Sequence, residues 1–89
     1  MAISKADGNQ REIVTSLRAV GATVQHLHTV RCGCPDLLVG YRGRNFLFEV
    51  KEGNAKLTEA EREWHTTWRG EVQVVRTPLE ALRAIGLQV

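Results

Sequence analysis

Apolar residues recur along this 89-residue chain with two different periods, and each period predicts a different kind of element. Over residues 13–20 the period is helical. Asn9 followed by Glu12 fits a capping box at the start of this helix, and Gly21 supplies its stop. The apolar positions of this first helix are Ile13, Val14, Leu17 and Val20.

The next part of the chain has the composition and alternation of strands. Residues 22–30 are rich in β-branched side chains and predict one strand, after which residues 31–35 form a loop. Residues 36–41 and 45–51 predict two further strands, joined by residues 42–44 or by part of them. The middle of the chain is therefore expected to form a run of three strands.

A second helix follows these strands. Thr58 and Glu61 repeat the capping-box pattern, and Gly70 provides the stop. One face of this helix carries Ala60, Trp64, Thr67 and Trp68.

Residues 71–76 then predict a buried strand, and the chain closes with a third helix. Thr77 is its N-cap in another capping box, Pro78 takes the first helical position, and the helix ends near Gly86. The resulting order is αβββαβα, which indicates one α/β domain over residues 1–89 with a mixed central sheet flanked by helices.

The composition excludes some classes of protein but does not indicate a function. Apolar residues make up 43% of the chain and charged residues 25%, as in an ordinary globular protein, and a net charge of +2 is too small to indicate nucleic acid. No secretory signal and no apolar run of roughly 18 residues is present. Two cysteines, Cys32 and Cys34, are too few for a disulfide framework. We therefore expect a cytoplasmic protein with no membrane contact.

Three charged residues stand out in the apolar hairpin: Asp36, Glu49 and Lys51. Because strand side chains alternate between faces, Glu49 and Lys51 point the same way, about 7 Å apart. A loop of two residues, 42–43, or of four residues places Asp36 on their face and opposite or near Glu49, whereas a loop of three separates them. Loop length therefore decides whether the three converge.

Convergence would create a site for a cation. Directly opposed strand residues have Cβ atoms roughly 4.5–5.5 Å apart, which lets two carboxylates share one ion. Without the ion the carboxylates repel and raise one another's pKa. Two carboxylates beside an ammonium group therefore suggest a hard divalent metal with oxygen ligands.

The segments "GCPDLLV", "LFEVK" and "LTEAEREW" resemble the PD-(D/E)xK nucleases, and most closely the VRR-NUC family, which relates to archaeal Holliday junction resolvases. The match runs from Gln10 to Leu82. The resemblance implies a restriction-endonuclease-like fold and a metal-dependent DNA endonuclease that uses Mg²⁺ or Mn²⁺. It also implies branched DNA such as a Holliday junction as the substrate, and a homodimer that cuts two strands.

The resemblance also implies roles for particular residues. Asp36, Glu49 and the carbonyl of Val50 would be metal ligands, and Lys51 would hold or activate the attacking water. A residue of the first helix would lie near the metal, and the helical angle favours Gln10, which is close to the centre of the apolar stripe.

The neighbouring candidate Glu12 is about 130° from that stripe, so a capping role is the simpler interpretation for it. Glu61 occupies a position where VRR-NUC sequences commonly have glutamine, and a carboxylate there is explained by capping alone. His65 is expected at the surface. Trp64 and Trp68 are expected in the core or on a dimer face rather than in base stacking.

Basic residues are expected in the loops that flank the site. Phosphate contacts there would come from Arg31, Arg42, Arg44 and Lys56.

Three alternatives remain open at this point. The first is a zinc site, because four possible ligands lie within nine residues, although their spacing fits no zinc knuckle or ribbon. The second is a non-catalytic DNA-binding or assembly module on the same fold. The third is a nickase or linear-duplex endonuclease. The possible zinc ligands are His26, His28, Cys32 and Cys34.

Overall fold

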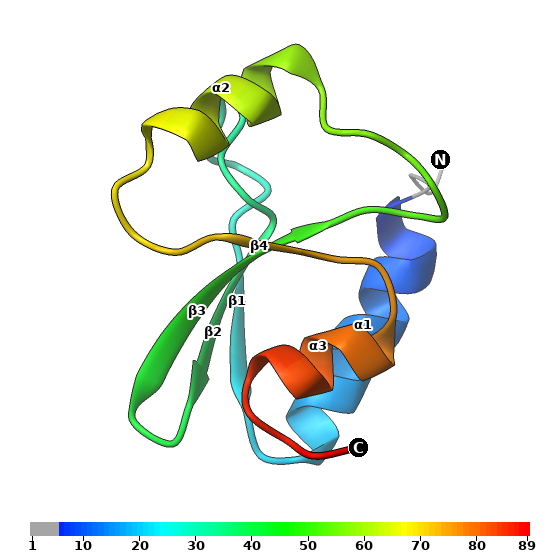
Figure 1. Ribbon diagram of the computed structural model, residues 1–89. Coiled ribbons are helices and arrows are strands. Elements are labelled where there is room, and N and C mark those ends of the chain that lie inside the picture. Colours follow the sequence, from blue (N-terminus) through cyan, green and yellow to red (C-terminus); the bar gives the residue numbers. More distant parts are fainter. Residues whose placement is uncertain (1–5) are drawn as a thin grey trace.

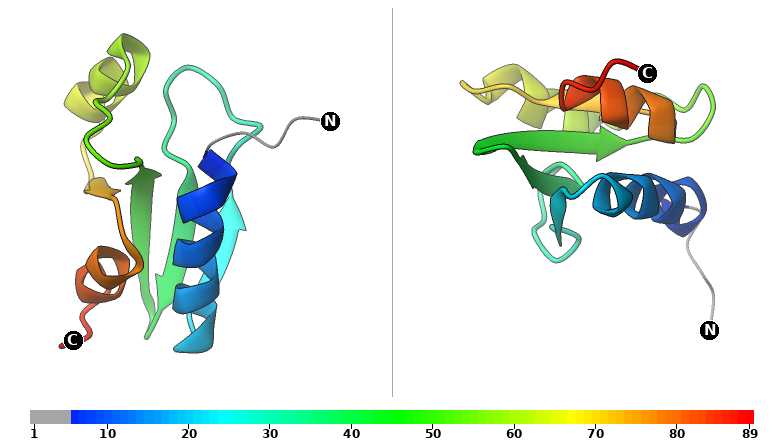
Figure 2. Two further views of the ribbon diagram at one scale, coloured as in Figure 1. Left: turned by 90° about the vertical axis from the view of Figure 1, so that its right-hand side faces the viewer. Right: turned by 90° about the horizontal axis from the view of Figure 1, so that it is seen from below.

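A computed structural model describes residues 6–89, which form a four-stranded sheet and three helices (Figure 1). Helices α1 and α3 lie side by side, and α2 lies at the end of the sheet away from the β2–β3 hairpin (Figures 1 and 2). The elements are α1 (Ala6–Ala19), β1 (Thr23–His26), β2 (Leu37–Tyr41), β3 (Arg44–Val50), α2 (Glu59–Thr67), β4 (Gln73–Val75) and α3 (Pro78–Ala84). The order αβββαβα is as expected.

The sheet is mixed, with the strand order β1-β2-β3-β4. The first three strands are antiparallel neighbours, and β4 runs parallel to β3. The β2–β3 hairpin closes through two residues, Arg42 and Gly43, with φ values of 52° and 78°. Two successive positive φ values are those of a type I′ turn, whose twist matches that of paired strands. Tyr41 consequently pairs with Arg44, so the two-residue loop is the one that the protein uses.

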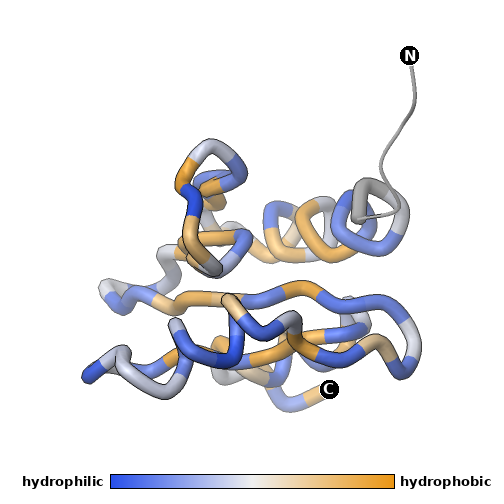
Figure 3. The backbone as a smooth tube through the Cα atoms, turned by 90° about the horizontal axis from the view of Figure 1, so that it is seen from above, coloured by the Kyte–Doolittle hydropathy of each residue, from blue (hydrophilic) through white to orange (hydrophobic). Residues whose placement is uncertain are grey.

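One face of the sheet holds the hydrophobic core. Strand alternation directs Phe46, Phe48 and Val50 of β3 to this face, where α1 and α3 supply the facing apolar side chains. Apolar stretches accordingly lie along the helices and strands, and several connecting loops are hydrophilic (Figure 3). The facing buried residues are Ile13, Val14, Leu17, Ala81 and Ile85.

The opposite face is covered only in part. Helix α2 has no buried residue, and near the end of β3 it meets this face through the Lys51–Glu61 ion pair and the approach of His65 to Glu49. Farther along the sheet Leu38 is 37% exposed, and Trp68, just after α2, is 46% exposed. Helices therefore flank the sheet as expected, with a full apolar layer on one face. No helix among residues 6–89 is long and apolar enough to cross a membrane.

Two predicted boundaries are wrong, one because of a long-range contact and the other because of a local turn. Helix α1 already begins at Ala6, so Asn9 is not its cap; the Asn9 side chain donates to the carbonyl of Lys51 at 2.9 Å instead. Strand β1 ends at His26 because the chain turns, with the Val30 N–H bonded to the Leu27 carbonyl at 2.9 Å.

The caps of the later helices are confirmed. Thr58 and Glu61 form a complete capping box at α2. At α3, Thr77 accepts the N–H of Glu80 at 3.1 Å, but the Glu80 carboxylate accepts the N–H of Arg76 at 2.7 Å, one residue before the cap.

Candidate active site

The β2–β3 register brings Asp36 to Glu49. Leu37 pairs with Phe48. In this antiparallel register Asp36, the residue before β2, therefore lies opposite Glu49, the residue after Phe48. The Asp36 carboxylate accepts the main-chain N–H of Val50 at 2.7 Å, which ties its side chain to the end of β3. The expected convergence of these two carboxyl groups is what the hairpin produces.

Glu49 is buried, with only 1% of its surface exposed. Burial, followed by the hydrogen bond with Asp36 and the negative charge of that residue, raises the pKa of Glu49 from 4.5 to about 9. The positive charge of Lys51 acts in the opposite direction but does not offset these effects. At neutral pH the metal-free pair therefore retains a proton that a cation would displace.

Lys51 forms an ion pair with Glu61 of α2, with 2.7 Å between Nζ and Oε1. The same Glu61 oxygen accepts the N–H of Thr58 at 2.8 Å within the capping box. Burial opposes ionisation of Glu61, yet its hydrogen bonds with Lys51 and Thr58 leave its pKa below the ordinary value. Capping alone is therefore an incomplete account of Glu61, because this residue also holds the site lysine.

His65 was expected at the surface, and that expectation is wrong. Its side chain is 14% exposed, and Nε2 lies 3.7 Å from Oε1 of Glu49. The signal that would have found it is helical spacing, since His65 follows Glu61 by four residues and shares its face. Once Glu61 faces Lys51, His65 is brought to Glu49, two residues earlier on the same strand face.

Cys34 lies close to the carboxyl pair. Burial, and then the negative charges of Glu49 and Asp36, raise the pKa of the Cys34 thiol. This thiol is therefore held protonated rather than activated as a nucleophile.

Gln10 is not joined to the carboxyl pair by any contact of the described residues. Its Nε2 lies 3.3 Å from Nδ1 of His26, across from α1 to β1. His26 pairs with Leu37, whose side chain is in the core, so this contact lies on the opposite face of the sheet from Glu49. Glu12 is exposed.

The four basic candidates are all exposed, but they do not all flank the site. Arg42 and Arg44 belong to the hairpin, at the other end of β3 from Glu49, as Figure 1 shows. Arg44 and Glu49 are five positions apart along the strand, or roughly 17 Å. The expected position beside the site is therefore wrong for this pair. Arg31 and Lys56 lie in the loops that precede β2 and α2.

The donor atoms at the site suit a hard cation. Residues 6–89 contain no cluster of three or more His, Cys, Asp or Glu side chains arranged to hold a metal ion. Two carboxyl groups do meet at Asp36 and Glu49, and Oε1 of Glu49 is buried without a hydrogen-bond partner. Two carboxylates completed by a main-chain carbonyl form an oxygen set of the kind that Mg²⁺ prefers.

The four possible zinc ligands are not gathered within the described part of the chain. The rings of His26 and His28 are 6.3 Å apart, and His28 lies in the turn after β1 rather than on the strand. The strand predicted over residues 22–30 would have held both histidines, but only His26 lies on β1.

Trp64 and Trp68 stack on each other, with ring centroids 4.6 Å apart and planes 18° apart. Neither belongs to the buried core, and Trp68 is largely exposed.

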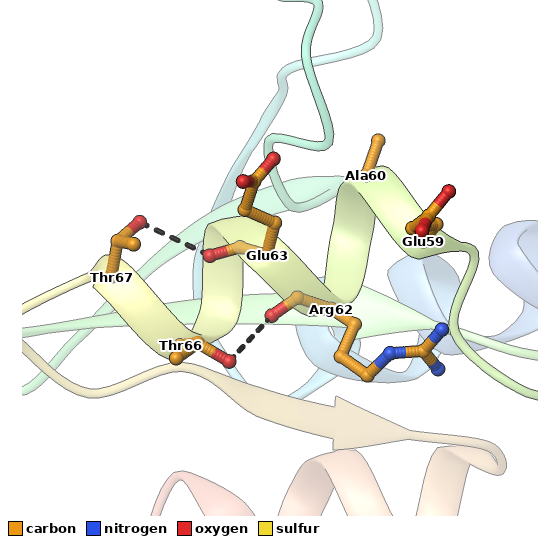
Figure 4. A pocket seen from close by; sticks show the side chains of 6 residues that line it. All are labelled: Glu59, Ala60, Arg62, Glu63, Thr66 and Thr67. Atoms are coloured by element: carbon orange, nitrogen blue, oxygen red, sulfur yellow. Dashed lines mark hydrogen bonds between the residues drawn. The ribbon is translucent and has the colours of Figure 1, made fainter.

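A hollow of about 580 Å³ runs along α2 (Figure 4). The hydroxyl groups of Thr66 and Thr67 in its wall donate to main-chain carbonyls of the same helix. None of the three site residues Asp36, Glu49 and Lys51 lines it. The candidate site is therefore defined by converging charges and not by this hollow.

The element order, the mixed sheet and its flanking helices define a restriction-endonuclease-like α/β fold. No family model matches the chain, and no curated protein matches it. A solved structure described as a VRR_NUC domain superposes with a TM-score of 0.74 and 29% sequence identity, over 93% of this chain and 96% of the other. This similarity over nearly the whole of both chains supports a relationship to the VRR-NUC family.

Proposed function

We propose that the protein is a PD-(D/E)xK-type nuclease, a divalent-metal-dependent DNA endonuclease that hydrolyses phosphodiester bonds. The observation that carries the proposal is the meeting of the Asp36 and Glu49 carboxyl groups, with Lys51 on the same strand face. The similarity to the VRR_NUC domain structure supports it independently. A buried carboxyl group whose pKa is strongly raised beside a second charged group is a common feature of functional sites.

In this proposal Asp36, Glu49 and the carbonyl of Val50 hold Mg²⁺ or Mn²⁺. The bound ion would supply polarisation of a phosphate oxygen and a lowered pKa for bound water. Lys51 orients the attacking water and stabilises the negative charge that develops on the phosphate. Glu61 holds the lysine side chain in place until substrate arrives. Gln10 remains a candidate contributor from α1, although its contact among the described residues is with His26.

The favoured substrate is branched DNA such as a Holliday junction, following the resemblance to archaeal resolvases. Arg31, Arg42, Arg44 and Lys56 are exposed and are proposed to bind DNA phosphates. A duplex that covers both the site and the hairpin would span the length of β3. We further propose a homodimer, with one active site for each strand, in the cytoplasm of a bacterial or phage-infected cell.

Two other functions would fit the same fold. A non-catalytic DNA-binding or assembly module would need no metal-binding carboxyl pair, so Asp36, Glu49 and Lys51 argue against it. A nickase or linear-duplex endonuclease would use the same chemistry on a different DNA.

The deciding experiment is cleavage of labelled four-way junction, flap, linear duplex and single-stranded DNA with Mg²⁺ or Mn²⁺. We expect the wild type to cut the junction only with metal and Lys51→Ala to lose at least about 100-fold in rate, as expected when a group acting on the transition state is removed. Arg18→Ala is the control, because it removes one positive charge from an exposed position in the last turn of α1, outside the proposed DNA contacts.

Cutting of linear duplex in preference to the junction would show that the protein is a nickase or linear-duplex endonuclease and not a junction-specific enzyme. Tight junction binding without cutting in either metal would favour the non-catalytic module and would reject the endonuclease.

A further inference from the structure

Two buried polar atoms at the site face each other without a partner. Oε1 of Glu49 and Nε2 of His65 are both inaccessible to solvent, and neither makes a hydrogen bond within the described part of the chain. They lie 3.7 Å apart, which is too long for a hydrogen bond. Buried polar groups are rarely left unpaired, so an unpaired couple of this kind calls for an explanation.

Two contacts hold helix α2 close to β3, so the His65 imidazole stays near Glu49. The Lys51–Glu61 ion pair ties the first turn of α2 to β3. Gly33 provides a second anchor, because a Cβ at this position would lie 2.3 Å from the Ala60 carbonyl oxygen. Only glycine allows the loop before β2 to approach the helix backbone so closely, and its φ of 83° also favours glycine.

The Glu49 carboxylate has two oxygens with different surroundings. Its interaction with Asp36 places it where a shared cation would bind, and Oε1 faces His65. Carboxylates that bind metals are commonly held in turn by a hydrogen bond from a neighbouring side chain, which fixes their orientation. A movement of roughly 1 Å would bring Nε2–H of His65 within bonding distance of Oε1.

We propose that His65 is a positioning residue for the metal site, donating from Nε2–H to Oε1 of Glu49. The bond leaves the other carboxylate oxygen turned toward Asp36 and the cation. This inference rests on the proposed function, since it assumes that Glu49 binds a divalent metal. It assigns to α2 a direct part in metal affinity in addition to its contact with the lysine.

The test is Mn²⁺ binding to the purified protein, measured by electron paramagnetic resonance of the free ion, with no DNA present. We expect His65→Phe and His65→Ala to weaken Mn²⁺ binding by about 10–100-fold. Phenylalanine keeps the ring shape but has no donor. His65→Gln places an amide donor near the position of Nε2 and should restore affinity to within about threefold of wild type.

Melting temperatures of the metal-free variants provide the second readout. A purely structural role would lower the melting temperature of His65→Phe and His65→Gln alike without separating their Mn²⁺ affinities. His28→Ala is the control, because it removes an exposed imidazole outside α2. It should bind Mn²⁺ as the wild type does.

The outcomes separate this inference from the proposed function. Wild-type affinity in His65→Phe, or equal losses in His65→Phe and His65→Gln, would overturn the role of His65. Loss of Mn²⁺ binding in Asp36→Asn at the same time would leave the proposed metal site standing. No Mn²⁺ binding by the wild type would overturn both.

Discussion

At the scale of the residue, the main feature is that Glu49 is buried next to a second carboxyl group. Water is excluded from Glu49, and Asp36 both bonds to it and repels its charge. Folding therefore favours the protonated form, and this preference follows from the hairpin that brings the two side chains together. A divalent cation bound as proposed would reverse the preference, because it would stabilise both charged carboxylates at once.

The raised pKa predicts how the stability of the metal-free protein changes with pH. Below pH 4.5 Glu49 is protonated in both the folded and the unfolded chain, so it adds no pH dependence. Between 4.5 and about 9 the unfolded chain ionises first, so the free energy of unfolding falls as the pH rises, and above about 9 the effect is complete. Glu49→Gln removes this titration.

The measurement is the melting temperature of wild type and Glu49→Gln in EDTA from pH 5.5 to 9.5. We expect the wild type to lose stability relative to the variant across this range. Added Mn²⁺ should stabilise the wild type more as the pH rises, since binding releases the shared proton. Parallel curves for the two proteins would show that Glu49 ionises at its ordinary pKa.

At the scale of the element, α2 depends on its first turn. The helix buries none of its residues, and Glu61 joins its capping box to the ion pair with Lys51. A short helix of this kind gains little from apolar packing, so its position over β3 relies on these polar contacts. The site and the helix are therefore expected to be lost together.

Two substitutions of Glu61 separate capping from pairing. Glutamine still completes a capping box but cannot form the ion pair, so Glu61→Gln should lower the free energy of unfolding by no more than about 1 kcal/mol. Alanine removes both contacts, and Glu61→Ala should cost about 0.5–1.5 kcal/mol more.

Urea denaturation measures both variants, with Glu63→Ala as the control because Glu63 is exposed on the same helix. If Gln and Ala at position 61 cost the same, the capping bond contributes nothing to stability, and this description of α2 is incorrect.

At the scale of the whole molecule, the hydrophobic core and the candidate site lie on opposite faces of the sheet. The hairpin lies at the end of β3 away from the site. One face holds the core under α1 and α3, and the other holds the carboxyl pair under α2. The hairpin extends away from the site and carries two exposed arginines. A DNA duplex bound at the site is the ligand that would reach both ends of β3.

Replacing Arg42 and Arg44 with alanine should therefore weaken DNA binding and lower its salt dependence. Each lost phosphate contact reduces the slope of log K against log salt by about 0.9, so the double variant should lose about 1.8. Fluorescence anisotropy between 50 and 200 mM salt measures this slope.

The control is Arg11→Ala with Arg18→Ala, which changes the net charge equally but on α1, over the core face. An unchanged slope in the hairpin variant would show that Arg42 and Arg44 do not contact DNA. An equal change in both double variants would indicate a general charge effect.

Patterns among residues close in sequence were sufficient to predict much of this structure. Strand alternation predicted that Asp36 meets Glu49 if the hairpin loop has two or four residues, because the pairing depends on residues close in sequence, and the protein uses the two-residue Arg42-Gly43 loop. The caps at Thr58 and Thr77 were predicted for the same reason. The start of α1 was not, since Asn9 bonds to Lys51, which lies 42 residues away.

The amino-acid sequence by itself therefore determined the order of the elements and the shared strand face of Glu49 and Lys51, since each follows from local backbone preference and from period, and it limited the hairpin to a few loop lengths. Only the tertiary structure decided that His65 faces Glu49, that Glu61 holds Lys51, and that Arg42 and Arg44 lie far from the site. Those facts depend on how α2 and the hairpin are placed relative to β3. Placement of that kind comes from contacts between distant segments, such as Gly33 against Ala60, which no local pattern encodes.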